Sequence, residues 1–359
     1  GVLPLRGQNN VQGACDMGAL PGVLPGYQPV TDADARSRFA AIWGTDRLPA
    51  KPGLTVVEMM HAAAAGQIKT LWIMGEDPLN SDPNAKHVRE ALSHTDFLIV
   101  QDIFLTDTAQ LADLVLPAAA WAEKSGTFTN TERRVQWCDP AVPALNDARS
   151  DLWIINAVGK RLDLELNAGN PPAVLNEINT AVPAYGGITR RRAAQSGGVH
   201  WPCPTEDHPG TPILHTDQFA TANGKGRFLA VTHHPPAEAI SDAYPLVLTT
   251  GRLALHYNSG SMTRRTAPLM ERVPTLRVEL HPDDAGRWDI EAGEPVKVIS
   301  PRGQITAEAW VTTTVDPGVV FVPFHFPGAN ELTNDALDGA AKIPEFKVAA
   351  CRLEKGGQG

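Results

Sequence analysis

The chain has 359 residues, of which 43% are hydrophobic and 20% charged, so it is long enough for two globular domains with buried cores. A net charge of −9 argues against a nucleic acid or an anionic membrane as partner, and no apolar run approaches the ~20 residues of a membrane span. Four cysteines without a C-x-x-C pair give no readable disulfide framework, zinc site or iron–sulfur site.

The first dense polar stretch runs from Leu5 to Gly18 and reads Leu-Arg-Gly-Gln-Asn-Asn-Val-Gln-Gly-Ala-Cys-Asp-Met-Gly. Its carboxamides and glycines favour a loop pressed against a flat polar ligand over a helix or a strand. Arg6 is its chemical centre, because a guanidinium keeps its charge and can hold a small carboxylate in one orientation beside a cofactor. A Gly/Asn-rich turn with a surface arginine is the alternative interpretation of the same residues.

The next part of the chain alternates strand and helix patterns. Short apolar runs at 70–74, 97–100 and 112–117 are typical of buried parallel strands. Helices are predicted at 56–65 and 83–93. This order predicts a doubly wound α/β unit, whose ligands bind beyond the carboxyl ends of the strands.

Polar residues follow two of these strands. The first strand is followed by Gly75, Glu76, Asp77 and Ser81, and the second ends at Gln101. Carboxylates can accept from the N1 and N2 donors of a guanine, and a carboxamide can donate or accept. Ordinary capping and turn chemistry explains the same residues about as well. The chain has no G-x-G-x-x-G or G-x-x-x-x-G-K-[ST] motif, which counts against nicotinamide-nucleotide or ATP binding.

The remainder of the chain divides into a helix, a connector and a β-rich part. A helix is predicted from Asp151 to about residue 162, followed by a Pro- and Gly-rich connector over 167–243. After residue 244, apolar runs joined by Gly and Pro turns predict a small closed β-barrel. Its predicted strands are 245–250, 276–280, 295–300, 304–312 and 318–323, with a helix near 282–288.

Two blocks of the barrel, 250–265 and 330–347, are more polar than turns require. An isolated histidine in such a block, such as His256, is more often a satisfied structural residue than a ligand. Arg264 and Arg265, like the run at 190–192, offer local positive charge for phosphates.

Three stretches carry a resemblance to a known family. The Arg6–Gly18 stretch, Gly-Thr-Phe-Thr-Asn-Thr-Glu-Arg-Arg at 126–134 and His-Tyr-Asn-Ser-Gly-Ser-Met-Thr-Arg-Arg at 256–265 resemble the molybdenum- or tungsten-dependent formate dehydrogenases of the dimethyl sulfoxide reductase superfamily. The resemblance runs in order from residue 5 to about 353. It corresponds to the C-terminal half of that family's catalytic subunit.

The resemblance implies reversible oxidation of formate to carbon dioxide at a molybdenum or tungsten centre held by two molybdopterin guanine dinucleotides. It implies an α/β unit followed by a C-terminal barrel of the double-psi type that caps the cofactor. Arg6 would be the catalytic residue that orients formate, and no metal ligand is expected in this chain. The implied cofactor contacts are Gln8, Gly75, Glu76, Asp77, Ser81, Gln101, Ala118, Asp151, Arg252, His256, Asn258, Asn330, Phe346 and Lys347.

Departures from the family are small within the chain. Phe324 and Phe346 stand where some members carry tyrosine, so a phenolic hydrogen bond is not expected there. The family's cysteine-rich segment for a 4Fe–4S cluster and its metal-ligating cysteine or selenocysteine do not occur. The resemblance therefore implies either a fragment or a split catalytic subunit, whose partner polypeptide carries that N-terminal half. Electron-transfer subunits are expected as well.

Three expectations complete the sequence-based interpretation. The domains are expected at 1–166 for the pterin-dinucleotide-binding region, 167–243 for the connector and 244–359 for the barrel. A cytoplasmic location is expected, although the missing initial methionine leaves a Tat signal on a longer product open. The alternatives to formate dehydrogenase are a related molybdopterin oxidoreductase, such as a nitrate reductase, and a non-catalytic pterin-binding or assembly protein.

Overall fold

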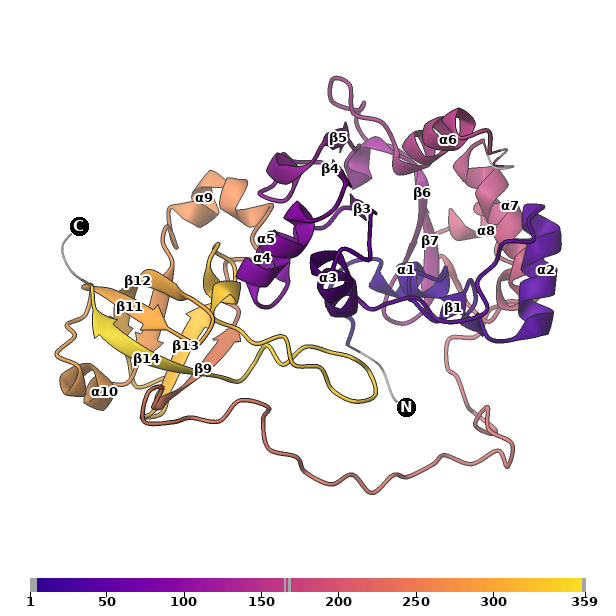
Figure 1. Ribbon diagram of the computed structural model, residues 1–359. Helices are drawn as coiled ribbons and strands as arrows, with labels where there is room; N and C mark the ends of the chain where they lie inside the picture. Colours follow the sequence, from indigo (N-terminus) through magenta and orange to yellow (C-terminus); the bar gives the residue numbers. More distant parts are fainter. Residues whose placement is uncertain (1–4, 165, 167–168, 357–359) are drawn as a thin grey trace. The chain divides into compact units, whose positions relative to one another are not determined.

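The structure is a computed structural model that describes residues 5–164, 166 and 169–356 (Figure 1). The chain forms two compact units, Gly1–Leu54 with Leu116–Val231 and Thr55–Val115 with Thr232–Gly359. Each unit has a hydrophobic core of its own. Among the residues described, no helix is both long and apolar enough to cross a membrane.

The first unit surrounds a core that includes Phe39, Val135 and Ile188. Strands β6, β7 and β8 form a three-stranded antiparallel sheet within it. Helix α7 and the segment up to Cys203 also contribute to this core. The first part of the predicted connector is therefore packed into the first unit. The elements are α1 Val11–Asp16, β1 Val23–Leu24, β2 Gln28–Pro29, α2 Ala33–Trp43, β6 Gly126–Thr129, β7 Arg134–Cys138, α6 Asp151–Arg161, α7 Pro171–Ala181, α8 Arg190–Ala193 and β8 Val199–His200.

The prediction of a loop throughout the N-terminal polar stretch is wrong for Val11–Asp16, which form helix α1. Asn10, in the left-handed conformation with φ 60°, precedes the helix, and its Oδ1 accepts from the Thr129 N–H at 2.9 Å. A Cβ at Gly13 would lie 3.1 Å from Thr129 Oγ1. The glycine therefore allows α1 to approach β6 closely, which outweighs its low helix propensity.

The second unit begins with the predicted α/β pattern. Strands β3 and β4 pair in parallel, and the sheet has the order β3-β4-β5. Helices α3 and α5 pack Met60, Val88 and Leu92 against the apolar residues of these strands. The α/β prediction is thus confirmed, with α3 Val56–Ala64, β3 Thr70–Met74, α4 Pro78–Ser81, α5 Ala85–Ser93, β4 Phe97–Asp102 and β5 Leu114–Pro117.

The second unit continues with a closed barrel of order β10-β12-β11-β14-β9-β13. Two neighbouring pairs, β10 with β12 and β9 with β13, are parallel, and the other pairs are antiparallel. The prediction of a closed barrel is confirmed. Its elements are β9 Leu246–Gly251, α9 Ala267–Met270, β10 Arg277–Leu280, α10 Pro282–Arg287, β11 Pro295–Ile299, β12 Gln304–Val311, β13 Val319–Pro323 and β14 Ala349–Lys355.

Strand β14 was not predicted from the sequence. Its stretch Ala-Ala-Cys-Arg-Leu-Glu-Lys has none of the β-branched or aromatic residues that favour strands. Cys351 and Leu353 are nevertheless buried in the barrel core, and β14 pairs with both β11 and β9. Closure of the barrel therefore determines this strand more than local propensity does.

Candidate functional site

In the first unit, the exposed Arg6 is linked to helix α1. Its Nε donates to Oε1 of Gln12 at 3.4 Å. Gln12 Nε2 donates in turn to Oδ1 of Asp16 at 2.7 Å and to the Tyr27 hydroxyl at 3.1 Å. Gln12 and Asp16 share one face of α1 because residues four apart on a helix are neighbours.

Asp16 is the centre of this network and is only 1% exposed. Its Oδ2 accepts from the Tyr185 hydroxyl at 2.6 Å and from Trp201 Nε1 at 2.7 Å. Burial raises the pKa of Asp16, and the hydrogen bonds that its carboxylate accepts oppose that rise. Sequence reasoning missed this network, although the Gln-x-x-x-Asp spacing indicates a shared helical face once the stretch is read as a helix.

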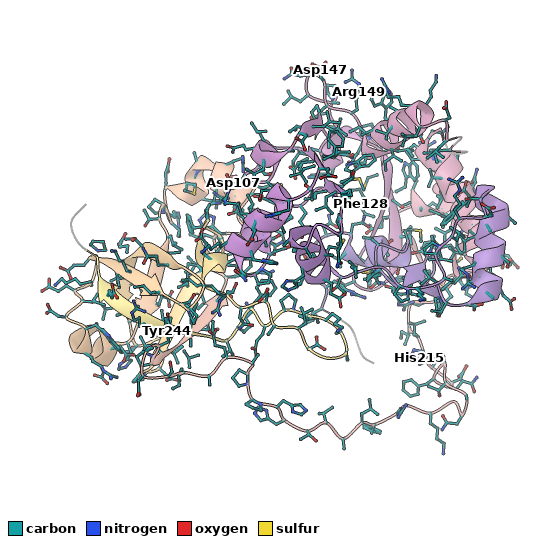
Figure 2. The ribbon with its side chains drawn as sticks, viewed as in Figure 1. Asp107, Phe128, Asp147, Arg149, His215 and Tyr244 are labelled. Atoms are coloured by element: carbon teal, nitrogen blue, oxygen red, sulfur yellow. The ribbon has the colours of Figure 1, made fainter. Side chains whose placement is uncertain are left out.

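The other predicted site residues of the first unit lie at two places. Gln8 is exposed just before α1, close to Arg6 in sequence. Ala118 is buried and forms a parallel bridge with Arg149, a residue labelled in Figure 2. Asp151 begins α6 and forms an ion pair with Lys124. Ala118 and Asp151 therefore meet near the start of α6.

In the second unit, the predicted strand-end residues share one edge of the sheet. Met74 lies opposite Gln101 in the parallel pairing, and the Gly75 N–H donates to the Gln101 carbonyl at 2.8 Å. Gly75 takes φ +66°, a conformation that favours glycine and turns the chain away from β3. The prediction that Asp77 and Gln101 lie at neighbouring strand ends is confirmed.

Asp77 is buried, and the polar groups around it use both of its oxygens. Oδ1 accepts from the Thr108 N–H at 3.0 Å and from the Thr108 hydroxyl at 2.6 Å. Oδ2 accepts from Asn80 Nδ2 at 2.7 Å, and the same amide group donates to Asp107, labelled in Figure 2, at 2.8 Å. These bonds fix the loop after β3 to the segment after β4.

Asp82 is a buried carboxylate with a different environment. Its Oδ1 accepts from the Ser81 hydroxyl at 3.0 Å, and its buried Oδ2 has no hydrogen-bond partner in the described chain. Burial, together with the neighbouring Glu76 carboxylate, raises the pKa of Asp82 to about 7. Ser81 Oγ also lies 3.4 Å from Glu76 Oε1. Asp82 was not predicted as a site residue, but it joins Glu76 and Ser81 in a cluster where two carboxylates share one hydroxyl donor.

Arginines from the barrel lie near these carboxylates. Arg264 has a buried Nε without a hydrogen-bond partner in the described residues. Burial lowers the pKa of Arg264, while the charges of Asp107 and Asp77 oppose that change. The Arg265 guanidinium lies 4.4 Å from the centroid of the Phe104 ring, in the loop after β4. The second unit therefore combines acidic and basic groups in one region.

A second cationic pair is formed by Arg252 and Lys347. Both charged groups lie 5.6 Å from the Phe324 ring centroid. Arg252 Nη2 donates to Asn258 Oδ1 at 2.6 Å, and Lys347 Nζ donates to the Thr250 carbonyl at 2.8 Å. Burial, and then the charge of Arg252, lowers the pKa of Lys347. Two like charges held this close are suited to a phosphate or another anion.

The remaining predicted residues of the barrel take part in internal hydrogen bonds. His256 Nδ1 lies 3.1 Å from Thr263 Oγ1, and its Nε2 lies 3.2 Å from the Val273 carbonyl oxygen. A contact between His256 and a ligand would require exchange of one of these bonds. The Phe346 carbonyl accepts from the Thr250 hydroxyl at 2.8 Å. Asn330 is buried, and its Nδ2 donates to the Asn80 carbonyl at 2.9 Å, which ties the barrel to helix α4.

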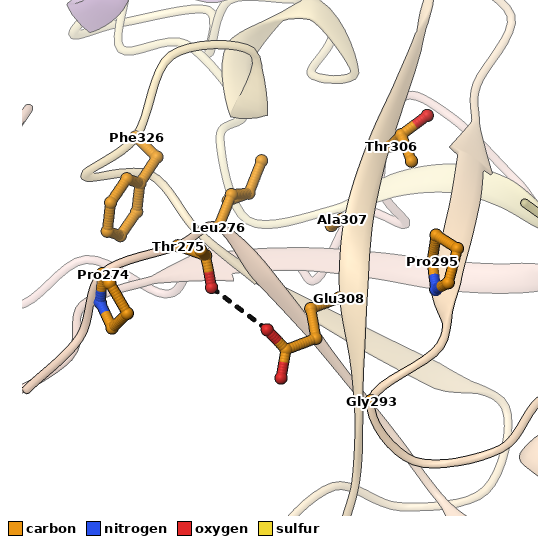
Figure 3. A pocket seen from close by; sticks show the side chains of 9 residues that line it. All are labelled: Pro274, Thr275, Leu276, Gly293, Pro295, Thr306, Ala307, Glu308 and Phe326. Atoms are coloured by element: carbon orange, nitrogen blue, oxygen red, sulfur yellow. Dashed lines mark hydrogen bonds between the residues drawn. The ribbon is translucent and has the colours of Figure 1, made fainter. Parts of the chain in front are cut away.

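A groove on the barrel adjoins these residues through Phe326, whose ring centroid lies 5.2 Å from that of His256 (Figure 3). Within it, the Thr275 hydroxyl donates to Glu308 Oε2 at 3.2 Å. Its lining contains none of the predicted site residues and consists of Pro274, Thr275, Leu276, Gly293, Pro295, Thr306, Ala307, Glu308 and Phe326. The groove is therefore not part of the candidate site.

Two family models match the chain. Residues 5–161 match the model described as "Molybdopterin oxidoreductase", and residues 246–350 match the "Molydopterin dinucleotide binding domain". The first match contains Arg6 and the acidic strand-end loop. The second contains Arg252, Arg264 and Lys347.

Individual relatives agree with these matches. The chain is 52% identical to the F420-dependent formate dehydrogenase subunit alpha of Methanocaldococcus jannaschii, over 99% of this chain and 53% of that protein. It is 38% identical to the assimilatory nitrate reductase catalytic subunit of Bacillus subtilis, over 97% of this chain and 51% of that protein. The chain thus spans about half the length of the curated relatives it matches.

A solved structure shows the same fold. Acetylene hydratase from Pelobacter acetylenicus aligns with a TM-score of 0.64 at 17% identity, covering 89% of this chain and 49% of that one. The family matches, the high identity to relatives and this shared fold agree with one another. The chain belongs to the molybdopterin oxidoreductase family.

Proposed function

We propose that this chain forms part of the catalytic subunit of a formate dehydrogenase, which interconverts formate and carbon dioxide. The observation that carries the proposal is the 52% identity, over 99% of the chain, to a subunit named as a formate dehydrogenase. The identity to a nitrate reductase subunit is lower, at 38%. The cofactor of this proposal is molybdenum or tungsten held by two molybdopterin guanine dinucleotides, which supply the two-electron redox chemistry when bound.

Arg6 is the group that would bind formate. Gln12 contacts its Nε, which leaves the two terminal nitrogens of the guanidinium to hold both oxygens of a carboxylate. Asp16 holds Gln12, and Tyr185 and Trp201 hold Asp16. Gln12 would therefore bias Arg6 weakly toward one orientation, and orientation is a large part of catalysis for so small a substrate.

The acceptor cluster of Glu76, Ser81 and Asp82 fits the guanine of a dinucleotide. Guanine offers adjacent N–H donors, and Asp82 Oδ2 is a buried acceptor without a partner in the described chain. The barrel cations Arg252, Arg264 and Lys347 would meet phosphate oxygens. The contacts proposed for the sheet edge and barrel also include Gly75, Asp77, Gln101, His256, Asn258, Asn330 and Phe346, and those of the first unit are Gln8, Ala118 and Asp151.

The proposed enzyme needs more than these residues. Its metal ligand and its 4Fe–4S cluster would be supplied by sequence outside this chain, on the same polypeptide or on a partner. Electron-transfer subunits are proposed because relatives are named as alpha subunits. A cytoplasmic location is part of the same proposal.

Replacement of Arg6 by lysine in the assembled enzyme tests the proposed role. Lysine keeps the charge but loses the planar fork, so we expect kcat/KM for formate to fall about a hundredfold, which corresponds to about 2.7 kcal/mol, with unchanged metal content. Arg47→Lys, an exposed arginine of the same unit, is the matched control. Wild-type kcat and KM in Arg6→Lys would show that Arg6 does not bind formate.

A further inference from the structure

Three potential metal ligands that are not among the proposed cofactor contacts converge in the second unit. His61 lies on α3, His87 lies on α5, and Asp335 lies in the segment between Asn330 and β14. One ligand atom from each residue lies within 4.8 Å of the others. His61 Nε2 and Asp335 Oδ2 are 3.2 Å apart.

The two imidazoles lie close together, with ring centroids 4.7 Å apart and an interplanar angle of 38°. His87 Nε2 is buried and has no hydrogen-bond partner among the described residues. A buried ring nitrogen without a partner is unfavourable unless something else binds it. Asp335 is partly buried, with 27% of its side chain exposed, so its charge is less screened than that of a surface carboxylate.

We propose that His61, His87 and Asp335 bind a zinc ion. Two imidazole nitrogens and one carboxylate oxygen are ligands that zinc accepts in a tetrahedral arrangement, and water would take the fourth position. Ligand atoms about 2 Å from zinc at tetrahedral angles lie about 3.3 Å apart, close to the separation of His61 from Asp335. The third ligand atom, from His87, lies within 4.8 Å of the other two and would have to move closer to them to bind the ion.

Zinc at this site would cross-link the α/β part of the second unit to its barrel part. Two other contacts join the same two parts: Asn330 with the Asn80 carbonyl at 2.9 Å, and Lys342 with Glu58 at 3.8 Å. The ion would strengthen this set, because a ligand that binds only the folded state stabilises it by mass action. The site is independent of the formate proposal, since none of its ligands is a proposed cofactor contact.

A zinc titration of the full chain, in its assembled complex and after dialysis against a chelator, tests the site. A chromophoric zinc indicator serves as competitor. We expect the wild-type chain to bind one equivalent of zinc at this site. His87→Ala and His61→Ala should each weaken it at least a hundredfold. His94→Ala, an exposed histidine at the end of α5, is the matched control and should bind like the wild type.

Asp335→Asn provides a second variant that preserves shape, so it decides the question if the histidine variants do not fold. It should bind zinc at least tenfold more weakly, and added zinc should raise the wild-type melting temperature but not that of this variant. Absence of the equivalent in the wild type, or equal zinc affinity in Asp335→Asn, would overturn the proposal.

Discussion

Two buried carboxylates, one in each unit, have opposite surroundings. Asp16 is 1% exposed and Asp82 is 5% exposed, and burial raises the pKa of both. Asp16 accepts hydrogen bonds from Gln12, Tyr185 and Trp201 at 2.6 to 2.7 Å. Asp82 accepts one bond from Ser81, and its Oδ2 accepts none in the described chain.

The difference separates a carboxylate whose oxygens are satisfied within the fold from one that we propose for ligand binding. Removal of Asp16 would leave buried donors without an acceptor, which is more costly than the loss of the bonds alone. Asp82 is destabilising until donors reach it, and a guanine would supply them. Burial therefore does not distinguish the two residues. The number of carboxylate oxygens that accept hydrogen bonds does distinguish them.

The largest effect is expected from Asp16→Ala. Three donors lose their acceptor, so the free energy of unfolding should fall by about 3 kcal/mol or more. Urea denaturation of the full chain measures this, with the exposed Asp46→Ala as control. A loss below about 1 kcal/mol would show that water or another group replaces the carboxylate.

A second effect concerns ligand binding by Asp82→Asn. The amide nitrogen of asparagine cannot accept a hydrogen bond. The affinity for GDP, used as a probe of the proposed guanine site, should therefore fall about tenfold to a hundredfold. This is the loss expected for a charge-assisted hydrogen bond of about 1.5–3 kcal/mol. The free energy of unfolding should not fall. Isothermal titration calorimetry measures the affinity, and the exposed Asp96→Asn serves as control. Unchanged GDP affinity would remove Asp82 from the guanine site.

A smaller effect is expected in the pH dependence of stability. The pKa of Asp82 is about 7 in the folded chain and 3.8 as its ordinary value, so the folded state binds more protons between these pH values. The contribution of Asp82 to stability is therefore complete below pH ~4 and is lost as pH rises toward 7. The difference in unfolding free energy between wild type and Asp82→Asn should change over this window, and a constant difference would contradict the raised pKa.

The smallest effect is expected from Gln12→Ala in the assembled enzyme. The 3.4 Å contact with Arg6 is long, so Gln12 should position the guanidinium only weakly. KM for formate should rise about threefold to tenfold while kcat changes little, because an interaction made equally in the ground and transition states is lost. A fall in kcat with unchanged KM would point to a different role for Gln12.

The sequence predicted those parts of the fold that depend on local pattern. The runs at 70–74 and 97–100 have the short, mainly apolar pattern typical of parallel strands, and they appear as β3 and β4. Helix α1 and strand β14 were missed because tertiary contacts decide them. Gly13 is needed for the approach to β6, and Cys351 is held by barrel closure.

The candidate site was predictable only in part for a related reason. The strand-end positions of Asp77 and Gln101 follow from the α/β pattern. No local pattern connects Asp16 with Tyr185 or Trp201, which follow it by 169 and 185 positions. The unpartnered oxygen of Asp82 and the buried nitrogen of Arg264 depend on packing, which the linear sequence does not display.

The most direct test of the proposed function uses the natively purified complex that contains this chain. Metal analysis is combined with formate-dependent reduction of a viologen dye and with nitrate-dependent oxidation of the reduced dye. We predict bound molybdenum or tungsten and dye reduction that depends on formate. A metal-loaded complex that turns over nitrate and not formate, or that turns over neither, would contradict the account.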